Sequence, residues 1–207
     1  MIKEQLGNIS LYNCDCMDFM ANCKDNEFDL AIVDPEYRDI NQPTKDMRNN
    51  GGLKKWKGKP TKSYFNELYR ISKEQIIWGA NNFQLPPFKG FVIYKKLTIS
   101  EVFTMSMAEI ASLSEGLGTI SKLFECVPQK KNRIHPTQKP IKLYEWLLLK
   151  YAKPGQKIFD SHFGSLSIGI ACHNLGYELT ACEKDKEYYD AAKKRLQIHQ
   201  MQLSLFK

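Results

Sequence analysis

The 207-residue sequence lacks several features that would place it in particular classes of protein. It contains no apolar run near the roughly 18 residues that a transmembrane helix needs, and its first ten residues lack the basic-then-apolar order of a secretory signal. Its six cysteines include no C-x2-C pair, so no metal site is predicted. We therefore expect a cytoplasmic protein with reduced, mostly buried thiols and no membrane partner.

Acidic residues are scarce relative to basic ones, and this imbalance is local. The net charge is +7, and residues 38–73 hold ten Lys or Arg against three Asp or Glu, an excess of seven. Within that stretch, residues 38–60 have few apolar side chains and are typical of a long mobile basic loop. Its charge predicts contact with a polyanion; a merely solvated loop is the alternative.

Strand and helix patterns alternate along most of the chain, which predicts one α/β domain over residues 1–207 with a doubly wound, mostly parallel sheet. The clearest strand is Phe28–Val33, whose nearly continuous apolar run is typical of a strand covered on both faces. Further strands are predicted at 11–14, 75–78, 91–94, 157–160 and 178–182, and helices at 17–23, 62–71, 140–150, 168–175 and 185–198.

Acidic residues stand where three predicted strands end, at Asp34, Asp160 and Glu183. The carboxyl ends of parallel strands share one edge of a sheet, where ligands bind. Gly164 follows Asp160 into a helix start, and Glu183 comes 19 residues after Gly164. A close backbone approach followed by an acid that accepts ribose hydroxyls predicts a nucleoside cofactor. An ordinary strand-turn-helix is the alternative, because the G-x-G-x-x-G pattern is absent.

The tetrapeptide Asp34-Pro35-Glu36-Tyr37 directly follows the apolar strand. Pro35 constrains the backbone just past the strand and so fixes where its neighbours point. An aromatic side chain can stack on an extruded base, while a carboxylate can hold the exocyclic amine and orient its lone pair for methyl transfer. Because Asp-Pro is also a common turn dipeptide, the tetrapeptide alone does not decide the function.

Four motifs follow one another along the chain. They are Asn13-Cys14-Asp15-Cys16, the Asp34 tetrapeptide, His135-Pro136-Thr137-Gln138-Lys139-Pro140 and Asp160-Ser161-His162-Phe163-Gly164-Ser165-Leu166-Ser167. Their order resembles the β class, the circularly permuted class, of S-adenosylmethionine-dependent DNA amino-methyltransferases, which act on adenine N6 or cytosine N4. The resemblance covers nearly the whole chain except the middle, and it implies a Rossmann-like methyltransferase fold.

The resemblance implies a role for individual residues. Asp34, with the Pro35 carbonyl, would accept the target amine, and Tyr37 would stack on the flipped base. The cofactor, S-adenosylmethionine, would contact Asp15, His135, Pro136, Thr137, Asp160, Phe163, Gly164, Ser165 and Glu183. Lysines of the basic loop would contact DNA phosphates, namely Lys54, Lys55, Lys57 and Lys59. Residues 97–133 would form a small inserted target-recognition region.

These inferences predict a site-specific methyltransferase, bacterial or phage-encoded, that methylates an adenine flipped from double-stranded DNA. Aspartate rather than serine at position 34 favours adenine over cytosine. The chain departs from the family's Asp-Pro-Pro-Tyr at Glu36 and from its Asp-Pro-Phe-x-Gly-Ser-Gly-Thr at Ser161, His162 and Leu166. A DNA-binding relic with weakened catalysis is therefore the second hypothesis, and the same chemistry on cytosine, RNA or a protein amide is the third. The resemblance leaves a homodimer open.

Overall fold

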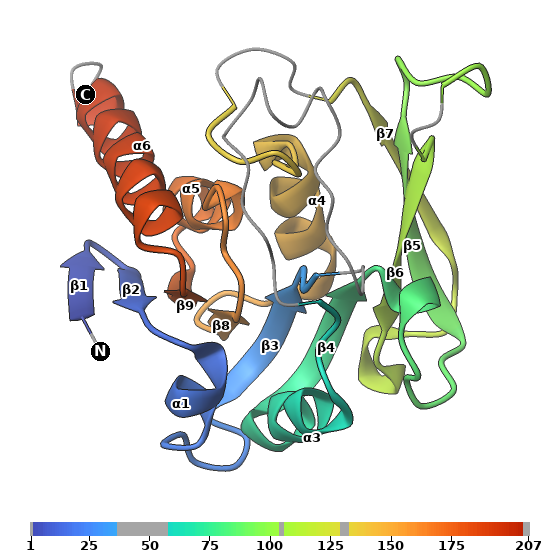
Figure 1. Ribbon diagram of the computed structural model, residues 1–207, viewed down its shortest axis with the longest axis horizontal. Helices are drawn as coiled ribbons and strands as arrows, with labels where there is room; N and C mark the ends of the chain where they lie inside the picture. Colours follow the sequence, from blue (N-terminus) through green and yellow to red (C-terminus); the bar gives the residue numbers. More distant parts are fainter. Residues whose placement is uncertain (1, 37–57, 104–105, 129–132, 205–207) are drawn as a thin grey trace.

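Among the residues described in this computed structural model, nine strands form one sheet in the order β1-β2-β9-β8-β3-β4-β6-β5-β7, with helices on both faces (Figure 1). The structure describes residues 2–36, 58–103, 106–128 and 133–204. The strands are β1 Ile2–Leu6, β2 Ile9–Asn13, β3 Phe28–Val33, β4 Ser72–Trp78, β5 Gly90–Lys96, β6 Ala108–Leu113, β7 Lys122–Cys126, β8 Lys157–Asp160 and β9 Glu178–Glu183. The helices are α1 Cys16–Met20, α3 Lys62–Ile71, η1 Ala80–Asn82, η2 Glu115–Leu117, α4 Ile141–Tyr151, α5 Ser167–Leu175 and α6 Lys186–Ser204.

The apolar run of β3 lies at the centre of the sheet and is buried on both faces. Leu30 and Ile32 belong to a core that includes side chains of α4, α5 and α6. Ala31 and Val33, which point the other way, belong to a second core with side chains of α1 and α3. Successive side chains of a strand alternate between faces, so a strand covered on both sides must be apolar at nearly every position.

Five of the eight strand pairings are parallel, and they join β2, β9, β8, β3 and β4 in one block and β5 to β7. From β3 the chain crosses to β4 on one side, whereas from β8 it crosses to β9 on the other side. The boundary between β3 and β8 is therefore a topological switch point, where the carboxyl ends of strands in such sheets leave a crevice for ligands.

The doubly wound α/β fold predicted from the sequence is confirmed, and three element bounds match those predicted: β3, α3 and β8. Pro140 is the N-cap of α4, and Gly176 ends α5 in the left-handed conformation, with φ of 77°. The Asp185 carboxylate caps α6 by accepting the backbone N–H groups of Glu187 and Tyr188 at 2.9 and 3.1 Å. All six cysteines are free thiols, three of them buried.

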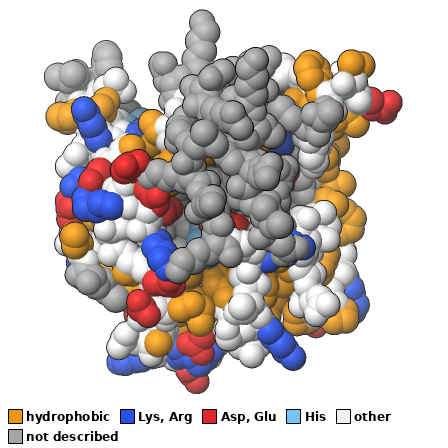
Figure 2. All heavy atoms as spheres, viewed as in Figure 1, with side chains coloured by type: hydrophobic (Ala, Val, Ile, Leu, Met, Phe, Trp, Pro, Cys, Tyr) orange, Lys and Arg blue, Asp and Glu red, His pale blue; other side chains and the backbone are white. Residues whose placement is uncertain are grey.

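Residues 97–133 contribute β6 and β7 to the main sheet, with the short helix η2 between them. β6 pairs antiparallel with both β4 and β5, so it lies between two strands that precede it in the chain. Large apolar side chains are exposed here, among them Val102, Phe103 and Leu123, and Figure 2 shows apolar surface along this side of the molecule. No helix among the described residues is long and apolar enough to cross a membrane.

Candidate active site

Two carboxylates meet at the switch point. Asp34 directly follows β3, and Asp160 ends the neighbouring strand β8. Asp160 is 2% exposed, and its Oδ1 accepts the backbone N–H of His162 at 3.0 Å. Burial raises the pKa of the Asp160 carboxyl to about 8, and the negative charges of Asp34 and Glu183 add to this rise. The sheet thus brings together two acids that lie far apart in the sequence.

A buried lysine is ion-paired with the Asp34 carboxylate. The Nζ of Lys139 contacts Asp34 Oδ2, and it lies 3.0 Å from Glu109 Oε2. The other oxygen of Glu109, Oε1, lies 2.6 Å from Lys96 Nζ. Burial disfavours the charged form of Lys139, but the carboxylates of Asp34 and Glu109 outweigh that cost and raise its pKa. Lys139 therefore carries its positive charge inside the protein.

The hexapeptide 135–140 spans the distance between the Asp34 tetrapeptide and the loop between β8 and α5. We call this loop the cofactor loop, after its predicted role. At its start, the His135 ring lies against Gly164 and forms an edge contact with Tyr188, with ring centroids 4.4 Å apart. At its end, Lys139 reaches Asp34. Inside it, Gln138 accepts the backbone N–H of Ile134 at 3.1 Å. The segment therefore fixes the cofactor loop relative to Asp34.

Glu183 ends β9 and holds the cofactor loop through hydrogen bonds from the backbone. Its Oε2 accepts the N–H of Gly164 at 3.0 Å, and its Oε1 accepts the N–H of Asp185 at 2.9 Å. Burial raises the pKa of the Glu183 carboxyl to about 7. Between the adjacent strand β2 and α1, Asp15 caps α1 by accepting the N–H of Met17 at 3.0 Å, and its ion pair with Lys184 lowers its pKa.

The loop between β8 and α5 contains an unusual backbone conformation. Leu166 has φ of 56° and ψ of 33°, in the left-handed region that disfavours side chains with a β-carbon. It is fully buried, and its side chain fills the space in which a β-carbon of Gly169 would otherwise lie. From α6, Arg195 donates to the carbonyl of Ser165 at 2.6 Å and so supports the loop.

Ser161 and His162, which depart from the family motif, form a polar chain. The Ser161 hydroxyl lies 2.6 Å from the Tyr64 hydroxyl and 2.8 Å from Nδ1 of His162. The Nε2 of the same ring lies 3.7 Å from the Cys16 sulfur. Burial lowers the pKa of the His162 imidazole to about 4, so the ring is neutral at physiological pH. These contacts join the cofactor loop to α1 and α3.

The structure places the other predicted site residues in different surroundings. Phe163 is 4% exposed, and its ring lies in the core, 5.9 Å from that of Tyr189, so its side chain is a packing element. Pro35 and Pro136 are buried, whereas Thr137 is exposed with its hydroxyl 3.1 Å from Nδ1 of His135. Of the four predicted DNA-contacting lysines, Lys59 is exposed. Tyr37, Lys54, Lys55, Lys57 and most of the 38–60 loop lie outside the described residues.

Glu36 replaces a proline of the family motif, and its carboxylate accepts the backbone N–H of Gly58 at 3.0 Å.

The sequence did not point to four residues of this site, namely Glu109, Lys96, Tyr64 and Arg195. Lys139 was named only as part of the hexapeptide, without a role. Its position in that specific motif was the one available signal. The described residues contain no cluster of His, Cys, Asp and Glu that could hold a metal ion.

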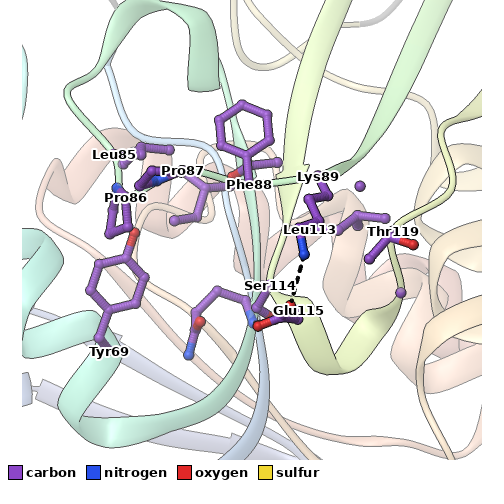
Figure 3. A pocket seen from close by; sticks show the side chains of 15 residues that line it. Tyr69, Leu85, Pro86, Pro87, Phe88, Lys89, Leu113, Ser114, Glu115 and Thr119 are labelled. Carbon is purple, nitrogen blue, oxygen red and sulfur yellow. Dashed lines mark hydrogen bonds and ion pairs between the residues drawn. The ribbon is translucent and has the colours of Figure 1, made fainter.

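A cavity of about 400 Å³ lies away from these residues, beside β4, the amino end of β5 and the carboxyl end of β6. Tyr69, Leu85, Pro86 and Phe88 line it, and an ion pair between Lys89 and Glu115 lies at one side (Figure 3). It holds neither the acids at the strand ends nor any residue of the four motifs. This cavity is therefore separate from the candidate active site.

Comparison with known proteins agrees with this geometry. The model of a family described as DNA methylase matches residues 19–194. A protein of Escherichia coli (strain K12) named "Putative methylase YubD" is 25% identical over 203 residues, covering 88% of this chain and 87% of that protein. The type II methyltransferase M2.DpnII of Streptococcus pneumoniae is 40% identical over 63 residues, which are 30% of this chain and 24% of that protein.

Two solved structures share the fold at low sequence identity. The M1.HpyAVI complex with SAM superposes with a TM-score of 0.61 at 19% identity, covering 90% of this chain and 99% of the other. The cytosine-N4-specific PvuII DNA methyltransferase superposes with a TM-score of 0.64 at 10% identity, covering 94% of this chain and 92% of the other.

Proposed function

This chain belongs to the DNA methylase family of adenine-N6 and cytosine-N4 amino-methyltransferases, and from that premise we propose that it methylates the N6 amine of adenine in double-stranded DNA with S-adenosylmethionine. The observation that carries this proposal is the pair Asp34 and Asp160, side by side at the carboxyl edge of β3 and β8. One acid follows the predicted catalytic strand, and the other begins the predicted cofactor loop.

The residues around Gly164 suit a nucleoside cofactor. Gly164 has φ of 47° and no β-carbon, so the backbone can approach a ligand closely. Glu183 offers carboxylate oxygens for ribose hydroxyls, and Asp160 offers a buried acid towards the methionine end. When bound, S-adenosylmethionine would supply an electrophilic methyl group on a positively charged sulfur. Asp15, His135, Pro136, Thr137, Phe163 and Ser165 complete the proposed set.

On the substrate side, the protein's task is to position an amine that is itself the nucleophile. Asp34 and the Pro35 carbonyl would accept its two N–H bonds, which orients the nitrogen lone pair towards the methyl group. Tyr37 would stack on the flipped base. Exclusion of water around the buried Asp34–Lys139 pair would strengthen these polar contacts. Aspartate at position 34 supports adenine over cytosine.

The test is methyl transfer by Asp34→Ala to unmethylated DNA, with mass analysis of the product base. The variant should lose transfer yet keep its affinity for S-adenosylmethionine in calorimetry, and Asp18→Ala, an exposed acid on α1, should keep both. Full activity of the Asp34 variant would sink the assignment, and 4-methylcytosine as product would replace adenine by cytosine. A homodimer stays a prediction of the resemblance, which sedimentation of the purified protein would test.

One observation favours the second candidate, a DNA-binding relic with weakened catalysis. Leu166 occupies a left-handed position that the family motif fills with glycine, and strain at that position bears on the cofactor loop. Calorimetry distinguishes the two candidates directly. Absence of S-adenosylmethionine binding at millimolar concentration, together with retained DNA binding, would favour the relic.

A further inference from the structure

Four side chains of alternating charge run from the proposed active site to strands β6 and β5. They are Asp34 after β3, Lys139 in the hexapeptide, Glu109 on β6 and Lys96 at the end of β5. Their side chains are 16%, 4%, 19% and 15% exposed, in that order. The row carries two positive and two negative charges, so it is neutral as a whole.

Lys139 is the most buried member, and its surroundings fix where the ammonium lies. Besides its two carboxylate partners, the Nζ lies 5.2 Å from the centre of the Trp78 ring, in cation–π contact. An ammonium without partners is costly to bury, and a second acid beside Asp34 compensates for much of that cost. Glu109 therefore provides a second carboxylate that anchors the ammonium of Lys139.

The fold does not need a buried ion pair at the end of β3 merely to pack its strands. Ion pairs elsewhere on the same strands are far more exposed: between Lys73 of β4 and Asp29 of β3, the exposed fractions are 57% and 23%. At the carboxyl end, in contrast, the ammonium contacts the one side chain to which the proposed chemistry assigns the target amine. A carboxylate fixed by an opposite charge is held both in orientation and in its ionised form.

We propose that Lys139 is a positioning residue for methyl transfer, which holds the Asp34 carboxylate in the orientation that accepts the target amine, and that Glu109 holds Lys139 in place. The proposal rests on the proposed function of Asp34. It assigns a task to the inserted strand β6 at the reaction centre, because β6 supplies Glu109. Lys96 completes the row by pairing with the far oxygen of Glu109.

Kinetics of Lys139→Met test the positioning role. We expect kcat to fall by ~10²-fold, as misplacement of a reacting group produces, whereas KM for DNA and the affinity for S-adenosylmethionine change less than ~3-fold. The acid limb of the kcat–pH profile should move to higher pH, because the Asp34 anion loses its positive neighbour. Lys73→Met, which removes the matched exposed lysine, should change none of these. Unchanged kcat and an unmoved acid limb in Lys139→Met would overturn the proposal.

Two further measurements separate positioning from folding and from the proposed function. The double variant Lys139→Met, Glu109→Gln removes the ammonium together with its anchoring charge, so it should fold yet stay as slow as Lys139→Met. Recovery of kcat there would show that only the stranded Glu109 charge mattered and would overturn the proposal.

A double-mutant cycle of Asp34→Asn and Lys139→Met on the unfolding constant needs no activity, and we expect a coupling of ~10-fold or more. Absence of coupling would overturn the role of Lys139. If the wild type is inactive but the coupling between Asp34 and Lys139 is present, the proposed function is rejected. Lys139 would then still be the residue that holds Asp34.

Discussion

The His135 ring lies against Gly164 so closely that a β-carbon on Gly164 would lie 3.3 Å from both Nε2 and Cδ2 of the imidazole. The two residues are 29 positions apart in the sequence, since 164 − 135 = 29. Gly164 also donates its N–H to Glu183 and has a left-handed φ of 47°. Its position thus connects the hexapeptide, the loop after β8 and the end of β9.

Gly164→Ala should therefore damage the cofactor loop beyond ordinary backbone strain. An alanine in the left-handed region costs about 1–2 kcal/mol, and here its β-carbon would also press on the His135 ring. Gly155→Ala is the matched control, because Gly155 has φ of 82° and no atom of the described residues lies within 4 Å of the added carbon. We expect the Gly164 variant to unfold at lower urea concentration and to bind S-adenosylmethionine at least ~10-fold more weakly. Equal effects of the two substitutions would show that the contact with His135 is unimportant.

Leu166 should reverse the usual ranking of glycine and alanine. In a helix, glycine is about 1 kcal/mol less stabilising than alanine. At Leu166, with φ of 56°, glycine avoids the left-handed strain, so Leu166→Gly should be about 1 kcal/mol more stable than Leu166→Ala. Both should be less stable than wild type because the leucine side chain is fully buried. Urea unfolding measures the order, and the pair Ile170→Ala and Ile170→Gly in α5 should rank the other way.

Asp160 should make the ligand-free protein lose stability as pH rises. Its folded pKa, raised by burial to about 8, exceeds the unfolded value of about 3.9, so between those values the folded state binds the extra proton. Its contribution to stability is therefore fully present below the unfolded pKa and is lost as pH rises through the folded pKa. Asp160→Asn removes this dependence and should gain on wild type by at least about 1 kcal/mol between pH 5 and pH 8. A difference in the free energy of unfolding between Asp160→Asn and wild type that stays constant from pH 5 to pH 8 would contradict a buried, protonated Asp160.

The same group should give cofactor affinity the opposite pH dependence. A cationic cofactor favours the ionised carboxylate, so binding would release the proton and tighten as pH rises towards 8. Glu183, whose pKa burial raises to about 7, should add to the trend. Calorimetry in buffers of different ionisation heats would count the protons released. In Asp160→Asn the affinity for S-adenosylmethionine should increase less steeply with pH. An unchanged pH dependence would assign the effect to Glu183 alone.

Neutralising the basic loop should weaken DNA binding in a salt-dependent way. If Lys54, Lys55, Lys57 and Lys59 contact phosphates, their joint replacement by glutamine removes about 0.9 from the slope of log K against log salt for each contact. The expected loss is therefore about 3–4 in slope. The control replaces four exposed lysines elsewhere, Lys24, Lys150, Lys153 and Lys157. A slope that changes equally in both variants would mean that the loop has no special part in binding.

The sequence alone determined the part of this protein built on the parallel strands β9, β8, β3 and β4. Period and length identified β3, α3 and β8 to the residue, because a strand buried on both faces and an amphipathic helix leave local signatures. Parallel pairing then required the acids after β3, β8 and β9 to share one edge. Motif order supplied the family, and the match to residues 19–194 confirmed it.

Only the tertiary structure decided how β6 and Lys139 contribute to the candidate site. β6 enters between β4 and β5, out of chain order, and no local period encodes which strand a segment will pair with. Lys139 and Asp34 are 105 residues apart, and Glu109 comes from residues 97–133, for which no strand or helix was predicted from the sequence. A buried ion pair depends on which charges the folded sheet brings within a few ångströms of each other, and that is a property of the topology rather than of either residue.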